Sequence, residues 1–405
     1  MDNFRLQNLI YNILVKVVVW GPVIQVLMLL LKYSGFEFID AADVMKSGVL
    51  FTIIIAIYLI SKNIQKYFIY VYSFMIIPTV VGLINLINAE SNQAVGFFII
   101  HLAGSMLIIS SIISFSNFNV NAINNLVEEI DRSAVLSLVL TFIYLVIYSS
   151  QALSDYLYFG PSTGILLVVF PWFVARKKIN FAIFCLILIF LGGKRAVMIS
   201  VLFEIILLLW LFGHDFYRLM ITNTIKIFVI FLSLLLLILT IFSDVDFTLV
   251  GEFFDLASGR ILGSFEGFAD DPNKISSGRF AEVNESLNIF TKNTLSIFLG
   301  LGFGWSFYWL DEWLHFLHFS PINFLYQYGL FSFLILTLIF ISQIHSFYMH
   351  FKKHRNIIFG IFFVIFLGQL VEGFFSYMYV VNPFMWCIFG ALIAMKKSKH
   401  KFISL

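Results

Sequence analysis

The residues best suited to chemistry in this chain are two arginines that follow glycine. The motif at 192–195, Gly-Gly-Lys-Arg, forms a very short connection between two apolar segments. The motif at 276–279, Ser-Ser-Gly-Arg, precedes apolar residues at helical spacing: Phe280, Val283, Leu287 and Phe290. This pattern predicts an amphipathic helix with a Ser or Gly cap and Arg279 in its first turn.

Both motifs predict anion sites. The guanidinium of arginine suits a bidentate contact with phosphate, and the free N–H groups at a helix start favour an anion as well. Each motif also has a structural alternative. Lys194 or Arg195 could snorkel at a helix end or pair with Glu204, and Arg279 could be a solvated loop cation. Arg260 ends a similar Ser-Gly-Arg pattern and is either a further cation of the site or solvated.

A third group of candidates lies between 300 and 329. Trp305, Trp309 and Trp313 recur every four residues with Tyr308 nearby, so we expect them to share a helix face. Such a face is either an interfacial aromatic belt or a platform on which sugar rings stack. His318 is a candidate general base or hydrogen-bond donor to phosphate, and its alternative is a structural role at the interface.

Acidic residues give weaker signals. Asp244 and Asp246 resemble a metal-binding pair, but two such carboxylates at the end of a span are more often solvated charges, and we predict neither metal nor cofactor. Polar residues that fall inside apolar segments are costly and give a weak transporter signal: Lys16, His101, Glu204, Lys226, Gln369 and Glu372. Cys185 and Cys387 also lie inside apolar segments, where we expect small buried hydrophobic residues.

The elements that must position these residues are membrane helices. The 405 residues are 60% hydrophobic and 12% charged, with mean hydropathy +0.96, which excludes an ordinary soluble protein. Apolar segments recur along the whole chain and predict an all-α polytopic membrane protein. About twelve spans are predicted: 9–31, 47–61, 67–88, 94–115, 134–150, 161–175, 179–192, 195–213, 221–242, 321–342, 357–373 and 378–395.

The distribution of positive charge predicts the orientation. The only long hydrophilic segment, 243–318, is a large loop within a single membrane domain, 1–405. With the N-terminus in the cytoplasm, most cations face inward: Arg5, Lys62, Lys66, Arg132, Arg176, Lys177, Lys178, Arg218, Lys352, Lys353, Arg355, Lys396, Lys397, Lys399 and Lys401. The short outer loops receive only Lys32, Lys46, Lys194 and Arg195. The positive-inside rule therefore predicts cytoplasmic termini and an outward-facing 243–318 loop.

The order of the motifs resembles a known family. The sequences GGKRA, SSGRFAEVNESLNIFTKNTLSIFLGLGFG and HFSPINFLYQYGLF follow one another within about 190–335. This order resembles the Wzy-type O-antigen polymerases and the related O-antigen ligases, membrane glycosyltransferases with a C-type fold. The resemblance implies attack by an acceptor sugar hydroxyl on a sugar linked to undecaprenyl pyrophosphate. The reaction would take place at the periplasmic face of the bacterial inner membrane, without nucleotide sugar or metal.

The resemblance also assigns roles to single residues. Arg195 and Arg279 match the family's arginines, and His318 matches a histidine eleven residues before a glycine, here Gly329. These three would be catalytic, and the two arginines would bind the pyrophosphate with help from Arg260 and Lys194. The family's His-Asn pair is His318-Phe319 here, and the nearest asparagine is Asn323. Residues expected to contact the substrate are Trp305, Tyr308, Trp309 and Asn323.

Two other functions fit the same sequence. An O-antigen ligase would transfer finished polysaccharide to lipid A core from the same donor, but the high Phe and Ile content resembles the polymerases. A polysaccharide or lipid-linked oligosaccharide transporter would show paired halves with broken helices, whereas the unusual residues here gather in one loop and a neighbouring turn. The expected partners are the lipid-linked oligosaccharide, the bilayer and a chain-length regulator, with no nucleic acid.

Overall fold

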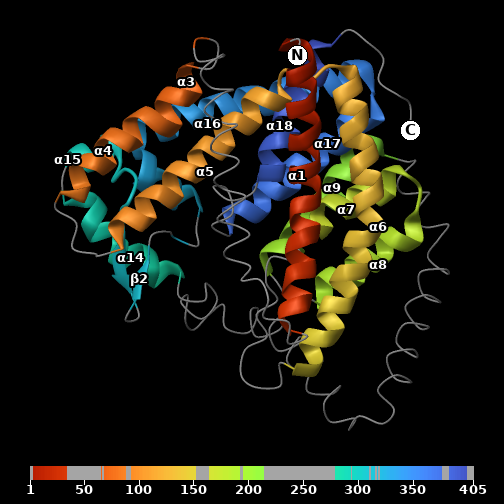
Figure 1. The fold of residues 1–405 in the computed structure, drawn as a ribbon, viewed down its shortest axis with the longest axis horizontal. Helices are drawn as coiled ribbons and strands as arrows, with labels where there is room; N and C mark the ends of the chain where they lie inside the picture. Colours follow the sequence, from red (N-terminus) through yellow and green to blue (C-terminus); the bar gives the residue numbers. More distant parts are fainter. Residues whose placement is uncertain are drawn as a thin grey trace.

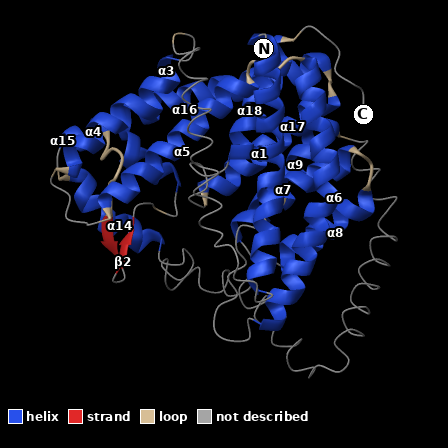
Figure 2. Ribbon diagram, in the orientation of Figure 1, coloured by secondary structure: helices blue, strands red, loops and turns tan. Residues whose placement is uncertain are grey.

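The protein is a bundle of helices with one small pair of strands (Figures 1 and 2). The computed structural model describes residues 3–33, 65, 68–87, 93–151, 164–191, 195–213, 279–292, 294–309, 312–314, 317, 320–375 and 383–398. Nearly all regular structure in these residues is helical, which confirms the predicted all-α class.

The helices of the first half alternate with short turns. From the N-terminus they are α1 (Asn3–Tyr33), α3 (Phe68–Val71), the π-helical turn η1 (Tyr72–Ile76), α4 (Ile77–Leu86), α5 (Ala94–Phe115), α6 (Val120–Gln151), α7 (Leu166–Ala175), α8 (Ile179–Leu191) and α9 (Arg195–Phe212). The second half contains α14 (Arg279–Thr291), α15 (Thr294–Leu299), β1 (Phe307–Trp309), β2 (Glu312–Leu314), α16 (Ser320–His354), α17 (Ile357–Phe374) and α18 (Pro383–Lys397).

Several of these helices suit a bilayer. Five segments are long and apolar enough to cross one: Tyr11–Met28, Ile69–Leu86, Ala94–Phe115, Ser320–His354 and Ile357–Phe374. Helices α7, α8 and α9 are also apolar but shorter. Large apolar side chains such as Ile84 (58% exposed) and Leu338 (65% exposed) face outward, as contact with lipid requires.

The predicted number of spans is only partly covered by the described residues. The predicted spans 47–61 and 221–242 lie outside them, so the total of about twelve stays a prediction. The predicted span 134–150 is the second part of α6, which begins at Val120. Asn119 explains this early start, because its Oδ1 accepts the N–H of Ala122 at 2.9 Å and caps the helix.

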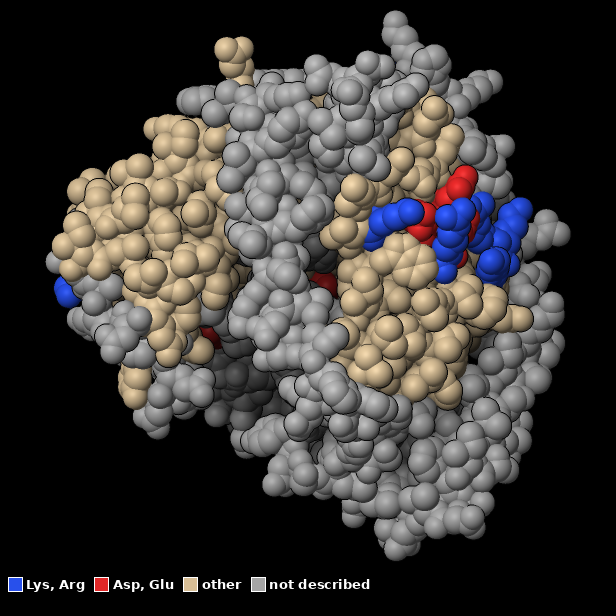
Figure 3. Space-filling model, viewed as in Figure 1, with Lys and Arg blue, Asp and Glu red and all other residues tan. Residues whose placement is uncertain are grey.

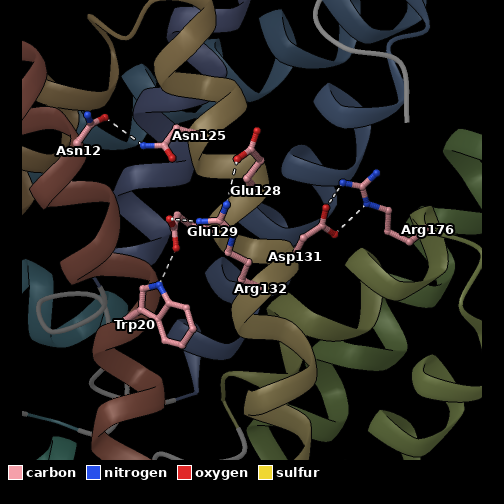
Figure 4. Close-up of polar contacts among 8 residues, drawn as sticks. All are labelled: Asn12, Trp20, Asn125, Glu128, Glu129, Asp131, Arg132 and Arg176. Carbon is pink, nitrogen blue, oxygen red and sulfur yellow. Dashed lines mark hydrogen bonds and ion pairs between the residues drawn. The ribbon is translucent and has the colours of Figure 1, made fainter.

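A polar network joins α1, α6 and α7 (Figure 4). Trp20 Nε1 donates to Glu129 Oε2 at 2.8 Å, which connects α1 to α6. Asp131 accepts from Trp172 Nε1 at 2.7 Å and from Arg176 Nε at 2.9 Å, and Arg176 Nη2 makes a second contact with the same carboxylate. This paired contact ties the end of α7 to α6.

Basic residues gather where several helices end. The ends of α7, α16 and α18 carry Arg176, Lys177, Lys178, Lys352, Lys353, Arg355, Lys396 and Lys397. Contacts join the ends of α16, α9 and α18: Arg355 Nη1, just after α16, donates to Leu211 O of α9 at 3.4 Å, and the charge of Lys396 of α18 acts on His350 of α16. Figure 3 shows part of this set over α6 and α7. We call this part of the bundle the basic end.

Candidate functional site

The candidate site lies at the opposite end of α16 from the basic end. The first turns of α16 contact α15 and the segment before β1, whereas its last turn contains Lys352 and Lys353. From Leu330 to Lys352 the helix rises about 33 Å at 1.5 Å per residue, close to the thickness of a bilayer core. In Figure 1, α14, α15 and the strands lie together beside α4, away from α17 and α9.

The centre of this region is the segment Gly300–Gly304, which we call the glycine loop. Gly300, Gly302 and Gly304 all have positive φ, between 74° and 85°, which favours glycine. The N–H of Leu301 donates to Tyr326 O at 2.6 Å, and that of Gly302 to Gln327 O at 3.1 Å. The loop is therefore hydrogen-bonded along the start of α16.

The glycine loop can bond to α16 because that helix is interrupted. Gly329 has φ 76° and ψ 166°, which is not helical. The break frees the carbonyls of Tyr326 and Gln327 from their intrahelical partners, and these are the carbonyls that the loop uses. A Cβ on Gly329 would collide with the backbone at Leu299 and Gly300. Glycine at positions 300 and 329 therefore lets the backbone of the loop touch the backbone of α16.

The other side of the loop contacts α4 and α5. The N–H of Phe303 donates to Pro78 O at 2.9 Å, and that of Gly304 donates to Nδ1 of His101 at 3.2 Å. Asn85 Nδ2 donates to Leu301 O at 2.8 Å. His101 is one of the polar residues that the sequence places inside an apolar segment, and its ring nitrogen accepts a hydrogen bond from the loop backbone.

The tryptophans do not share a helix face, contrary to expectation. Trp309 lies in β1, and Trp313 lies in β2, paired with Tyr308 in an antiparallel hairpin. A turn separates the two tryptophans, and they belong to adjacent pairs of the hairpin, so their positions lie on opposite faces of it. Trp305 precedes β1 and is buried.

Trp305 belongs to a small aromatic core beneath α14. Its ring stacks on Phe307 with centroids 5.9 Å apart and meets Tyr326 edge-on at 6.1 Å, and Phe290 stacks on Tyr326 at 4.3 Å. Trp305 is 6% exposed, so its faces are occupied by protein. Tyr308 is 53% exposed, so its ring is open to the surroundings. The side chain of Trp309 lies outside the described residues.

Both predicted arginines lie at the described start of a helix. Arg279 and Arg195 are the first described residues of α14 and α9, and the residues before them, 276–278 and 192–194, lie outside the described residues. Helix α9 ends at Phe212, which contacts Phe351 at the basic end, so Arg195 lies about 25 Å away along the helix axis. The side chains of both arginines, and the whole of Lys194, Arg260 and His318, lie outside the described residues.

Asn323 contacts the chain next to His318. Its Oδ1 accepts the N–H of Leu317 at 2.9 Å, and both residues are buried. The asparagine therefore fixes the backbone one residue before the candidate base. Its predicted contact with substrate stays a prediction.

No metal site emerges from the described part of the chain. It contains no group of three or more His, Cys, Asp or Glu placed to hold a metal ion. Asp244 and Asp246 lie outside it. Comparisons with protein-family models, curated proteins and solved structures found no match to this chain.

The residues that contact the glycine loop were not predicted from the sequence. Pro78, Gly82 and Asn85 received no role, although they meet the loop directly. The available signals were the three alternating glycines at 300–304 and the lone Gly329 in an apolar helix, since an isolated helix glycine often marks a close approach.

Proposed function

We propose that the protein is a membrane glycosyltransferase that polymerises lipid-linked oligosaccharide repeat units at the outer face of the bacterial inner membrane. The observation that carries the proposal is the placement of Arg195 and Arg279. Each is the first described residue of its helix, and Arg195 lies at the end of α9 remote from the basic end. If the basic end faces the cytoplasm, as the positive-inside rule requires, Arg195 faces outward, and we assign Arg279 to the same side.

The proposed chemistry needs cations where charge develops. Transfer of the growing chain to the acceptor repeat unit releases undecaprenyl pyrophosphate, which gains negative charge in the transition state. An arginine at a helix start stabilises that charge through its guanidinium and through the free N–H groups of the first turn. Arg260 and Lys194 would add to the positive field.

Deprotonation of the acceptor hydroxyl is assigned to His318. A positioned base contributes typically 10²- to 10⁴-fold to rate. The anchoring of Leu317 by Asn323 supports a fixed position for the neighbouring histidine. The exposed ring of Tyr308 is a surface on which a sugar can stack.

A reconstituted assay tests the proposal. Purified protein in liposomes would be given the lipid-linked repeat unit extracted from a strain that lacks this protein, with a metal chelator and no other acceptor. A polymerase converts it to a ladder of products that differ by one repeat, because one molecule serves as donor and another as acceptor. Polymer transfer that occurs only after addition of lipid A core would show a ligase instead. Movement of unchanged repeat units across the bilayer would show a transporter.

A further inference from the structure

A buried carboxyl group on α9 has no partner. Glu204 is 0% exposed, and neither of its carboxylate oxygens has a hydrogen-bond partner. Its carboxylate lies against Gly368 of α17, where a Cβ would collide with Oε1, Cδ and Cγ of the glutamate. The glycine thus leaves the space that the carboxyl group occupies.

A second polar pair faces this region from α17. Gln369 and Glu372 are three residues apart, and Gly368 and Glu372 are four apart, so these residues share one side of the helix. Both polar side chains are buried, at 4% and 1% exposure. Glu372 is close enough for its charge to act on Glu204, and Oε1 of Gln369 has no donor.

The surroundings contain no described cation. The described helices that pack on α9 are α17, α7 and α8, and α16 contacts its last turn, where Tyr348 stacks on Trp210. Their titratable groups around Glu204 are Glu372 from α17 and Cys185 from α8, whereas α7 has no titratable or charged side chain between Leu166 and Ala175. Glu204 is eight residues from Phe212, about 12 Å below the basic end and therefore in the membrane interior.

Among the described residues, neither carboxylate oxygen of Glu204 receives a hydrogen bond, and neither does Oε1 of Gln369. An ionised carboxylate buried without a partner costs far more free energy than the neutral acid. One added proton converts an acceptor into an O–H donor, for which Gln369 Oε1 and Glu372 are the acceptors on the facing helix. A metal ion would need more ligands than the described His, Cys, Asp and Glu residues provide there.

We propose that Glu204, with Gln369 and Glu372 of α17 beside it, forms a proton-binding site in the membrane interior, with the Glu204 carboxyl group protonated at neutral pH. The proposal is independent of the glycosyltransferase assignment. It rests on the burial of Glu204 and Glu372, on the missing partners of Glu204 and Gln369 and on the space left by Gly368.

Modification with dicyclohexylcarbodiimide tests this site in intact membranes, because the reagent enters lipid and reacts with protonated carboxyl groups. We expect mass spectrometry to find the adduct on Glu204 at pH 7 and to find less of it as the pH is raised to 10. Glu128, whose side chain is 60% exposed and ion-paired with Arg132, is the internal reference and should stay unmodified.

The same experiment can overturn the proposal. Absence of adduct on Glu204 at pH 7, while the reagent is active toward a control membrane protein, would show that this carboxyl group is ionised or lies outside the membrane interior. Protection by NaCl at constant pH would show a metal cation in place of the proton. Because the adduct is measured on the wild-type chain, the result does not depend on whether a variant folds.

A variant adds a second readout. Glu204→Gln imitates the neutral acid, so we expect its thermal unfolding temperature in detergent to equal or exceed that of the wild type at pH 7. The matched control is Glu129→Gln, which weakens the bonds of that carboxylate to Trp20 and Arg132 and should lower the unfolding temperature. A marked loss of stability for Glu204→Gln alone would indicate an ionised, paired carboxylate and overturn the proposal.

Discussion

Gly82 of α4 and Gly302 of the glycine loop touch through their backbones. A Cβ on Gly302 would collide with the N and Cα of Gly82, and a Cβ on Gly82 would collide with the backbone of Phe303. Two residues that are 220 positions apart in the chain are therefore both restricted to glycine. This contact joins the segment with α14 and the strands to α4.

Replacement of Gly302 should destabilise the protein. Gly302→Ala adds a collision at a residue with φ 74°, and we expect a loss of about 2–4 kcal/mol in stability. Thermal unfolding in detergent measures it. Gly96→Ala is the control, because a Cβ there meets nothing within 4 Å. Equal unfolding temperatures for the two variants would contradict the tight contact.

Substitution of two asparagines should distinguish an effect on stability from an effect on activity. Asn323 and Asn119 each accept one backbone N–H, at 2.9 Å in both cases. Asn323→Ala and Asn119→Ala should each lose about 1 kcal/mol of stability. Only Asn323→Ala should also reduce the length and yield of polymer in the reconstituted assay, because it releases the backbone beside His318. Equal activity of both variants would remove Asn323 from the site.

The arginines at the two helix starts should be essential. Arg195→Ala or Arg279→Ala should abolish polymer formation, and Lys should restore little because it keeps the charge but loses the planar fork. Lys292→Ala is the control, since Lys292 is an exposed cation just after the end of α14. Gel analysis of the polymer, at protein levels matched by immunoblot, measures the effect. A normal ladder from Arg279→Ala would show that Arg279 is only a solvated cation.

Arg176 should matter more for stability than Arg132. Arg176→Ala removes a paired contact with Asp131 and should cost about 1–3 kcal/mol, measured by thermal unfolding. Arg132→Ala should cost about 0–1 kcal/mol of stability, because the side chain of Arg132 is 62% exposed. The reverse order would mean that the network in Figure 4 does not join α6 to α7 in the membrane.

Thiol labelling should determine which side of the membrane each end faces. The only cysteines, Cys185 and Cys387, are buried and can be replaced by alanine. In that background, Lys292→Cys should react with an impermeant reagent in cells whose outer membrane is permeabilised. Lys353→Cys should react only after the inner membrane is broken. The opposite pattern would reverse the orientation and exclude the proposed periplasmic reaction.

Hydropathy and local spacing determined the class of the protein and the start of α14. The apolar segments predict membrane helices because an apolar stretch of sufficient length is stable across lipid only as a helix. The Ser-Ser-Gly-Arg motif and the apolar spacing after it predict a helix start at Arg279, because both signals are local. The same reasoning was wrong for Trp309 and Trp313, because a hairpin turn lies between them and each belongs to a different strand.

Only the tertiary structure decided what the glycines and the buried polar residues contact. The sequence shows Gly82, Gly302, Gly300 and Gly329 as isolated residues, and nothing local indicates that they meet in pairs. Likewise, Glu204 and Gly368 are 164 positions apart and become neighbours only when α9 packs against α17. The physical reason is that close backbone contact and burial without a partner are properties of two elements together. Neither is encoded in the spacing of residues along one of them.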